Sequence, residues 1–184
     1  MTERTLVLIQ RDAVERGFTE DILSRFEKAG LKVVARKIVV PTKEMSEKHY
    51  RATDEQVTGM GNKTLRASQE SKKEREVKEI FSTTDPKKIG ERLLSWSREF
   101  IVGKPLVAVV LEGENAIKKV REMIGYTDPS KAEKGTIRGD YGDDSISRAN
   151  AEGRRVRNLV HASDSPESAE LEISLWFKPG EIKK

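Results

Sequence analysis

The stretch KPLVAVVLEG, residues 104–113, contains the clearest strand signal in this 184-residue chain. Six consecutive apolar residues lie between Pro105 and Gly113. A short apolar run that is rich in β-branched residues and bounded by turn residues is typical of a strand buried inside a sheet. Directly after it, ENAIKKVREMIG (114–125) has the spacing of an amphipathic helix that ends at a glycine. This region therefore predicts a buried strand followed by a covering helix.

Outward from this pair, the same two patterns alternate along the chain. Compact apolar runs predict three more strands, at 4–10, 31–41 and 158–163. Helical spacing of apolar residues predicts helices at 19–30, 43–52, 85–103 and 165–177. Strands interleaved with amphipathic helices indicate one sheet covered by helices, in an α+β or an α/β arrangement.

Two segments depart from this alternation. Residues 58–90 are strongly charged, and the two signs are interleaved. A nucleic-acid-binding arm would carry mainly one sign, so we predict a surface helix in an insertion. Residues 126–156 are polar and show no long periodic element. A connection of that length is often functional.

Composition limits the class of protein. Charged residues make up 36% of the chain, but the net charge is only +4, which suits anionic small ligands as well as nucleic acid. The chain has no cysteine, which excludes disulfides and thiolate chemistry, and its two histidines are too few for most histidine-based metal sites. No segment has the pattern of a signal peptide or a membrane span, so we expect a cytoplasmic protein with no membrane partner.

One of the two histidines, His161, ends the apolar run NLV and precedes a strong helix-start signal, SDSPES. Ser165 is a typical N-cap and Pro166 fits the first helical position. A helix N-terminus favours a nearby anion, and neutral imidazole is able to accept a phosphoryl group, with the Ser163 hydroxyl as an additional donor. The alternative is a buried structural histidine that finishes a strand.

Glu172 lies on the following predicted helix, beside the face that packs inward. A carboxylate there is able to hydrogen-bond one ring nitrogen of His161 and so leave the other nitrogen for attack. The alternative is a boundary glutamate with its carboxylate in solvent.

Arginines in two polar motifs suggest a phosphate clamp. KGTIRGD (134–140) places Arg138 between two glycines, where the backbone can approach a ligand and the guanidinium matches phosphate oxygens. REMIGYTDP (121–129) adds Arg121 one turn before a helix end and Thr127 in the loop. If these three residues converge, they form a site for a polyphosphate.

Together these motifs resemble the nucleoside diphosphate kinase family. NLVHASDSPESAELEISLWF, GTIRGDY and MIGYTDP are each similar to a family motif, and they stand in the family's order, as do RTLVLI…DAVERG and the pair HY at 49–50. The resemblance implies a ferredoxin-like α+β sandwich, in which helices cover a four-stranded antiparallel sheet. It leaves out two segments, so we expect a single domain over 1–184 with insertions at about 53–85 and 142–155.

The same resemblance implies an activity. A nucleoside triphosphate such as ATP phosphorylates His161, and the phosphohistidine passes its phosphoryl group to a nucleoside diphosphate in a ping-pong reaction. Tyr50 and Glu172 would position His161, with Ser163 beside them, and Asn158 would hold the ribose side of the nucleotide. The phosphates would be held by three residues, Arg121, Thr127 and Arg138.

The resemblance also implies partners. Mg²⁺ would be bound mainly through the nucleotide phosphates, without dedicated protein ligands. Family members assemble as hexamers or tetramers, so we expect a homo-oligomer.

The chain departs from the family at IQRD. Gln10 stands where the family has a phosphate-binding lysine, and Arg11 stands where it has a proline. Glutamine donates a hydrogen bond but brings no charge, which should weaken stabilisation of the transferred phosphoryl group. Arg11 compensates only if the strand end turns its side chain inward.

A second group of cations precedes the active-site strand. EGRRVRN (152–158) contains Arg154, Arg155 and Arg157. These arginines either reach the phosphates or a neighbouring subunit, or they pair with acidic residues nearby.

Two alternatives to an active kinase follow from these observations. Gln10 suggests a catalytically weak, nucleotide-binding relative with a regulatory or scaffold role. The basic pI suggests a nucleic-acid-binding module on a ferredoxin-like sheet, which we favour least because the chain lacks an aromatic sheet motif.

Overall fold

Four antiparallel strands form one sheet in the order β2-β3-β1-β4. Their bounds are Thr2–Ile9 for β1, Lys32–Val39 for β2, Leu106–Glu114 for β3 and Val160–Ala162 for β4. The strand with the strongest sequence signal, β3, occupies a central position, and its residues from Leu106 to Leu111 are all buried. A strand that is apolar on both faces fits this position because helices cover both sides of the sheet.

The computed structural model describes residues 2–70 and 72–183. By their internal contacts these residues form two compact units. The sheet unit comprises the described residues 2–41, 103–144 and 157–183, and the helical unit comprises 42–70, 72–102 and 145–156. The single domain over 1–184 stays a prediction.

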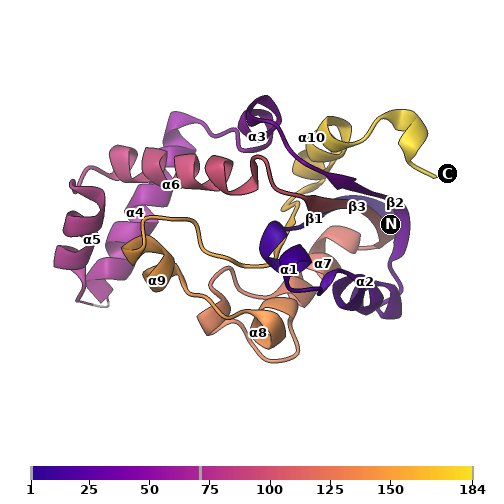
Figure 1. Cartoon of the computed structure of the whole chain (residues 1–184), viewed down its shortest axis with the longest axis horizontal. Coiled ribbons are helices and arrows are strands. Elements are labelled where there is room, and N and C mark those ends of the chain that lie inside the picture. The colour runs from indigo at the N-terminus through magenta and orange to yellow at the C-terminus, as the bar shows by residue number, and fades with distance from the viewer. Residues whose placement is uncertain (1, 71, 184) are drawn as a thin grey trace. The chain divides into compact units, whose positions relative to one another are not determined.

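Without the five-residue helices α1 and α8 and the 3₁₀ turns, the sheet unit has the order β-α-β-β-α-β, followed by α10 (Figure 1). Its helices are α1 (Arg11–Glu15), α2 (Thr19–Lys28), α7 (Ala116–Ile124), α8 (Ile137–Tyr141) and α10 (Pro166–Trp176), with 3₁₀ turns η1 (Pro129–Lys131) and η2 (Pro179–Glu181). Apolar residues of α2 and α7 share one core with Val7, Ile9 and Val109 of the sheet, and α10 packs against β1. The predicted ferredoxin-like α+β sandwich is confirmed.

The helical unit contains α3 (Lys43–His49), α4 (Asp54–Glu70), α5 (Glu74–Phe81), α6 (Pro86–Ile101) and α9 (Ile146–Ala151). The charged segment 58–90, predicted as a surface helix, forms most of α4, all of α5 and the start of α6. Two glycines let α4 and α6 approach closely, because an added Cβ would lie 1.8 Å from the Pro86 carbonyl oxygen at Gly61 and 1.9 Å from the Val57 carbonyl oxygen at Gly90. Both predicted insertions therefore contribute to this unit.

The last strand and the long polar stretch differ from the prediction. β4 begins at Val160, two residues later than predicted, because Leu159 has a left-handed backbone conformation that a strand cannot include. The stretch 126–156 contains the short helices α8 and α9. The hydroxyls of Thr136 and Ser145 cap these helices, accepting from Gly139 N at 3.1 Å and Arg148 N at 3.1 Å.

Across residues 2–70 and 72–183, no helix combines the length and the apolar character needed to cross a membrane.

Candidate active site

His161 is the middle residue of β4 and pairs with Leu8 of β1. Its neighbours Val160 and Ala162 belong to the core shared with α2 and α7. Because successive residues of a strand point to opposite faces, His161 points to the other face, where α10 packs on β1. Pairing and alternation thus aim the histidine at the helix that carries Glu172.

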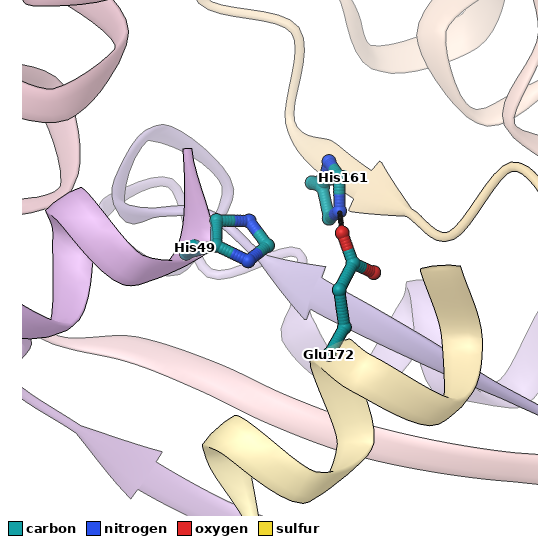
Figure 2. A group of neighbouring side chains, drawn as sticks. All are labelled: His49, His161 and Glu172. Atoms are coloured by element: carbon teal, nitrogen blue, oxygen red, sulfur yellow. Dashed lines mark hydrogen bonds and ion pairs between the residues drawn. The ribbon is translucent and has the colours of Figure 1, made fainter. Parts of the chain in front are cut away.

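The predicted contact between His161 and Glu172 is present. The distance from His161 Nε2 to Glu172 Oε1 is 2.9 Å, and both side chains are partly buried (Figure 2). In Figure 2 Glu172 projects from α10 toward the ring edge of His161 on β4. A carboxylate that accepts from Nε2 favours the tautomer with its proton on that nitrogen.

Ser163 completes a hydrogen-bonded chain around this carboxylate. Its hydroxyl donates to Glu172 Oε2 at 2.5 Å and accepts from Leu6 N at 3.3 Å. The two oxygens of Glu172 therefore have different partners, one the imidazole and the other a hydroxyl that is itself fixed by the sheet. Such a chain restricts the carboxylate to one rotamer.

The predicted helix start after His161 is confirmed. Pro166 is the first residue of α10, and the Ser165 hydroxyl accepts from Ser168 N at 3.1 Å. Binding of an anion at this end of α10 remains a prediction.

Arg138 has a structural function that the sequence did not predict. It is only 6% exposed, and its guanidinium donates to three backbone carbonyl oxygens: Asn158 at 3.0 Å, Gly125 at 2.9 Å and Val160 at 2.6 Å. Arg138 thus fastens α8 to the end of α7 and to the start of β4. Its predicted phosphate contact remains a prediction.

Three of the residues predicted to contact the phosphates and the sugar lie together between the end of α7 and the start of β4. The Asn158 side-chain amide donates to the Thr127 carbonyl oxygen at 3.2 Å, and the Asn158 backbone accepts from Arg138. Arg121 lies on the last turn of α7, exposed, four residues before the glycine carbonyl that Arg138 contacts. The structure therefore brings Thr127, Arg138 and Asn158 into contact and leaves Arg121 at the neighbouring helix end.

Gln10 lies at the end of β1, at the N-cap position of α1, and is 0% exposed. Its backbone N–H donates to the Leu159 carbonyl oxygen at 2.8 Å. Among the described residues, neither Oε1 nor Nε2 of its side chain has a hydrogen-bond partner. Arg11, the first residue of α1, is half-buried, and its predicted compensation for the missing lysine stays a prediction.

Tyr50 belongs to the helical unit, whereas His161 and Glu172 belong to the sheet unit. The Tyr50 carbonyl oxygen accepts from Arg98 Nη2 at 2.9 Å, and its hydroxyl contacts the Arg155 guanidinium. The predicted influence of Tyr50 on His161 remains a prediction.

The cations before β4 take different partners. Arg154 pairs with Glu152 at 2.6 Å, in line with the acidic pairing proposed from the sequence. Arg155 lies over the rings of Tyr50 and Phe100, at 5.2 and 5.4 Å from their centroids. Arg157 uses its backbone N–H to bond the Asp144 carboxylate at 2.9 Å.

Sequence reasoning missed Asp12, which is 5% exposed and accepts from Leu159 N at 2.9 Å through Oδ2. The available signal was an aspartate placed directly after a strand, in the first turn of a helix and two residues from Gln10. Its partner lies 147 residues further along the chain, so no local pattern identifies it.

On this ferredoxin-like sheet the imidazole of His161 is hydrogen-bonded to a carboxylate. This arrangement fits the class of histidine-dependent phosphotransferases. The comparisons with known proteins make this specific. The sequence model of the family described as nucleoside diphosphate kinase matches residues 3–58 and 60–182. This chain belongs to the nucleoside diphosphate kinase family.

Similar proteins match almost the whole chain. A nucleoside diphosphate kinase of Pyrobaculum aerophilum is 44% identical over 98% of this chain and 97% of its own length. One from Pyrococcus furiosus is 42% identical over 98% of this chain and 86% of its own.

Solved structures agree with these matches. The crystal structure of an NDP kinase from Pyrobaculum aerophilum has a TM-score of 0.94 at 42% identity and covers all of both chains. A transition-state mimic of the kinase from Borrelia burgdorferi, with bound vanadate and ADP, has a TM-score of 0.77 at 31% identity, covering 100% of this chain and 91% of that one.

Proposed function

We propose that this chain transfers a phosphoryl group from a nucleoside triphosphate to a nucleoside diphosphate through a phosphohistidine at His161. The observation that carries the proposal is the hydrogen-bonded chain from Ser163 through Glu172 to His161 Nε2. A histidine used only for packing needs no carboxylate to fix its tautomer. A nucleophilic imidazole does, because only the unprotonated nitrogen attacks.

The geometry suggests which nitrogen reacts. With the proton of the neutral ring on Nε2, beside Glu172, Nδ1 carries the lone pair. Nδ1 forms a bond to the γ-phosphorus, the bond from that phosphorus to its bridging oxygen breaks, and the nucleoside diphosphate leaves. Positive charge that develops on the ring is stabilised by the Glu172 carboxylate at 2.9 Å. The second diphosphate then attacks the phosphohistidine, and the same steps run in reverse.

The phosphate and sugar contacts belong to the same proposal. Arg121 and Arg138 offer cationic N–H groups to phosphate oxygens, and the Thr127 hydroxyl offers a neutral donor. Asn158 would contact the ribose, since its Oδ1 is buried without a hydrogen-bond partner among the described residues. The Gln10 amide would donate to the transferred phosphoryl group, with Arg11 as the nearest additional cation along the chain.

Magnesium fits this donor set as an ion that arrives with the nucleotide. The arginine, threonine and amide groups match phosphate oxygens rather than a bare cation, so the phosphates themselves would supply most of the ligands of Mg²⁺. When bound, the ion would neutralise charge on the β- and γ-phosphates.

The names of the similar proteins support nucleotides as partners, and the Borrelia burgdorferi structure holds bound ADP. We further propose a cytoplasmic homo-oligomer, a hexamer or a tetramer, without nucleic acid or membrane partners. A catalytically weak relative that binds nucleotide is the second candidate, and the neutral, buried Gln10 amide is the observation that favours it.

Steady-state kinetics with ATP, GDP and Mg²⁺ test the proposal. We expect GTP formation with parallel double-reciprocal lines, as a ping-pong reaction requires. The His161→Ala variant should lose the reaction and keep its fold, as judged by circular dichroism. A wild-type chain that binds ADP but forms no GTP would favour the second candidate instead.

A further inference from the structure

The backbone just before β4 adopts a conformation that needs external support. Leu159 has a φ of +68°, in the left-handed region, and its side chain is fully buried. A bulky residue rarely occupies this region, because its Cβ crowds the following carbonyl oxygen. Such a conformation persists where surrounding contacts impose it, and these places are often functional.

Contacts from the start of α1 hold both polar groups of Leu159. The Leu159 N–H donates to Asp12 Oδ2 at 2.9 Å, and its carbonyl oxygen accepts from Gln10 N at 2.8 Å. The Gln10 contact uses backbone, which any residue other than proline would supply. The Asp12 contact uses a side chain, so it depends on this residue.

The residues on either side of Leu159 are fixed as well. Val160 N donates to the Asn158 carbonyl oxygen at 2.7 Å, which closes a tight turn around Leu159. The Arg138 guanidinium donates to the carbonyl oxygens of Asn158 and Val160. The turn is therefore held by α1 through Asp12 and by α8 through Arg138.

This turn connects two residues of the proposed site. Asn158 stands directly before it, and His161 stands two residues after it on a strand of only three residues. Three residues pair β4 with β1, so the turn that leads into the strand acts together with this pairing to place the histidine against Glu172.

We propose that Asp12 is a positioning residue for phosphoryl transfer: its carboxylate holds the left-handed turn at Leu159, which orients Asn158 and the imidazole of His161. This inference rests on the proposed function. It assigns Asp12 the task of accepting one backbone hydrogen bond, for which the oxygen is needed and the negative charge is not.

Two substitutions separate the oxygen from the charge. Asp12→Asn keeps an acceptor oxygen at the same place, and Asp12→Ala removes it. Ile22→Val, in the core that α2 shares with the sheet, serves as a control that lowers stability without removing any hydrogen bond to Leu159. For each chain we would measure single-turnover phosphorylation with saturating ATP and Mg²⁺, and the ¹⁵N resonances of the His161 ring without nucleotide.

We expect Asp12→Ala to slow phosphorylation between about tenfold and a hundredfold, as a small misplacement of a nucleophile does, and to shift the His161 Nε2 resonance. Asp12→Asn should retain the wild-type rate to within about threefold, because a neutral acceptor makes the same bond. Ile22→Val should lower the unfolding midpoint and leave both the rate and the ring resonances unchanged.

Two results would overturn the inference: an Asp12→Ala chain with wild-type rate and resonances, or an Asp12→Asn chain as impaired as Asp12→Ala. If the wild-type chain formed no phosphohistidine, the proposed function would fail. In that case the ring resonances alone would decide whether Asp12 positions His161.

Discussion

A histidine in the middle of a short strand serves either as a packed residue or as a reactive group, and its neighbours distinguish the two. His161 faces α10, and its ring remains 22% exposed while Val160 and Ala162 on either side are buried. Glu172 and Ser163 surround one edge of the ring with a fixed chain of hydrogen bonds. Partial access to the ring together with a fixed tautomer is what a nucleophile requires.

Replacing the carboxylate should expose its contribution. We expect Glu172→Gln to lower the rate of His161 phosphorylation by about a hundredfold, because a neutral amide no longer stabilises the charge that develops on the ring. Ser163→Ala should lower this rate by a smaller factor, since the hydrogen bond between Glu172 and His161 remains. Rapid-quench measurement of the phosphoenzyme gives both rates, with exposed Glu170→Gln on the same helix as control. Equal rates in Glu172→Gln and wild type would contradict the assigned role.

A second prediction concerns the substitution Gln10→Lys. A Gln10→Lys chain would carry a cation at a fully buried position, so without nucleotide we expect a loss of about 2 kcal/mol or more in the free energy of unfolding. A bound phosphate would pair with this cation, so ADP should raise the unfolding midpoint more than in wild type, and kcat should rise about tenfold. Thermal unfolding with and without ADP, together with kcat, checks both parts. An unchanged kcat would mean that another group already supplies the charge.

At the scale of elements, the approach of α4 to α6 depends on two glycines that touch backbone carbonyl oxygens. We expect Gly61→Ala or Gly90→Ala to cost about 2–4 kcal/mol in the free energy of unfolding of the helical unit, because the helices must separate to admit a methyl group. Gly59 lies on the same helix as Gly61, and a Cβ added there would meet no atom within 4 Å, so Gly59→Ala should stabilise by up to about 1 kcal/mol. Urea unfolding of the three variants tests this contrast, and an equal effect at all three positions would refute it.

The attachment of α8 to α2 should depend on pH. Asp140 accepts hydrogen bonds from Gly135 N at 2.9 Å and from Arg25 Nη1 at 2.7 Å. Both bonds lower the pKa of Asp140 below its usual 3.8, and the bond from the Gly135 N–H has the larger effect. A carboxyl group with a lowered pKa stabilises the fold above its unfolded pKa, and this stabilisation is lost as the pH falls through the folded value. We therefore expect Asp140→Asn to be less stable than wild type at neutral pH and to lose less stability below about pH 4. Unfolding midpoints from neutral to acidic pH check this, and parallel curves for the two chains would contradict it.

Strands and helices long enough to show an apolar pattern were predictable from the sequence, and shorter helices were not. The pattern of six apolar residues in β3 and the helical spacing in α2, α6, α7 and α10 predicted these elements to within a few residues. Helices α1, α8 and α9 have five or six residues each, which is too short for a period to appear. Capping hydroxyls and long-range hydrogen bonds define these helices instead.

For the molecule as a whole, sequence patterns predicted one sheet covered by helices, and the family resemblance implied its ferredoxin-like form and the contact of His161 with Glu172. Neither predicted the contacts that support this site. The contacts of Arg138 with Val160 and of Asp12 with Leu159 span 22 and 147 residues, and each joins a side chain to backbone. Backbone acceptors and donors have no sequence signature, so such contacts become visible only in the folded chain. The charged insertion likewise predicted a surface helix, whereas together with 145–156 it contributes to a separate compact unit.

The central claim is that the phosphoryl group passes through His161, and the composition of the chain makes this directly measurable. The chain has only two histidines, His49 and His161, so peptide mapping distinguishes them without ambiguity. After incubation with ATP and Mg²⁺, we expect one phosphoryl group on His161, in a form that acid removes and base spares, and its release when GDP is added. A label on His49, an acid-stable label on a hydroxyl group, or no label would contradict the account.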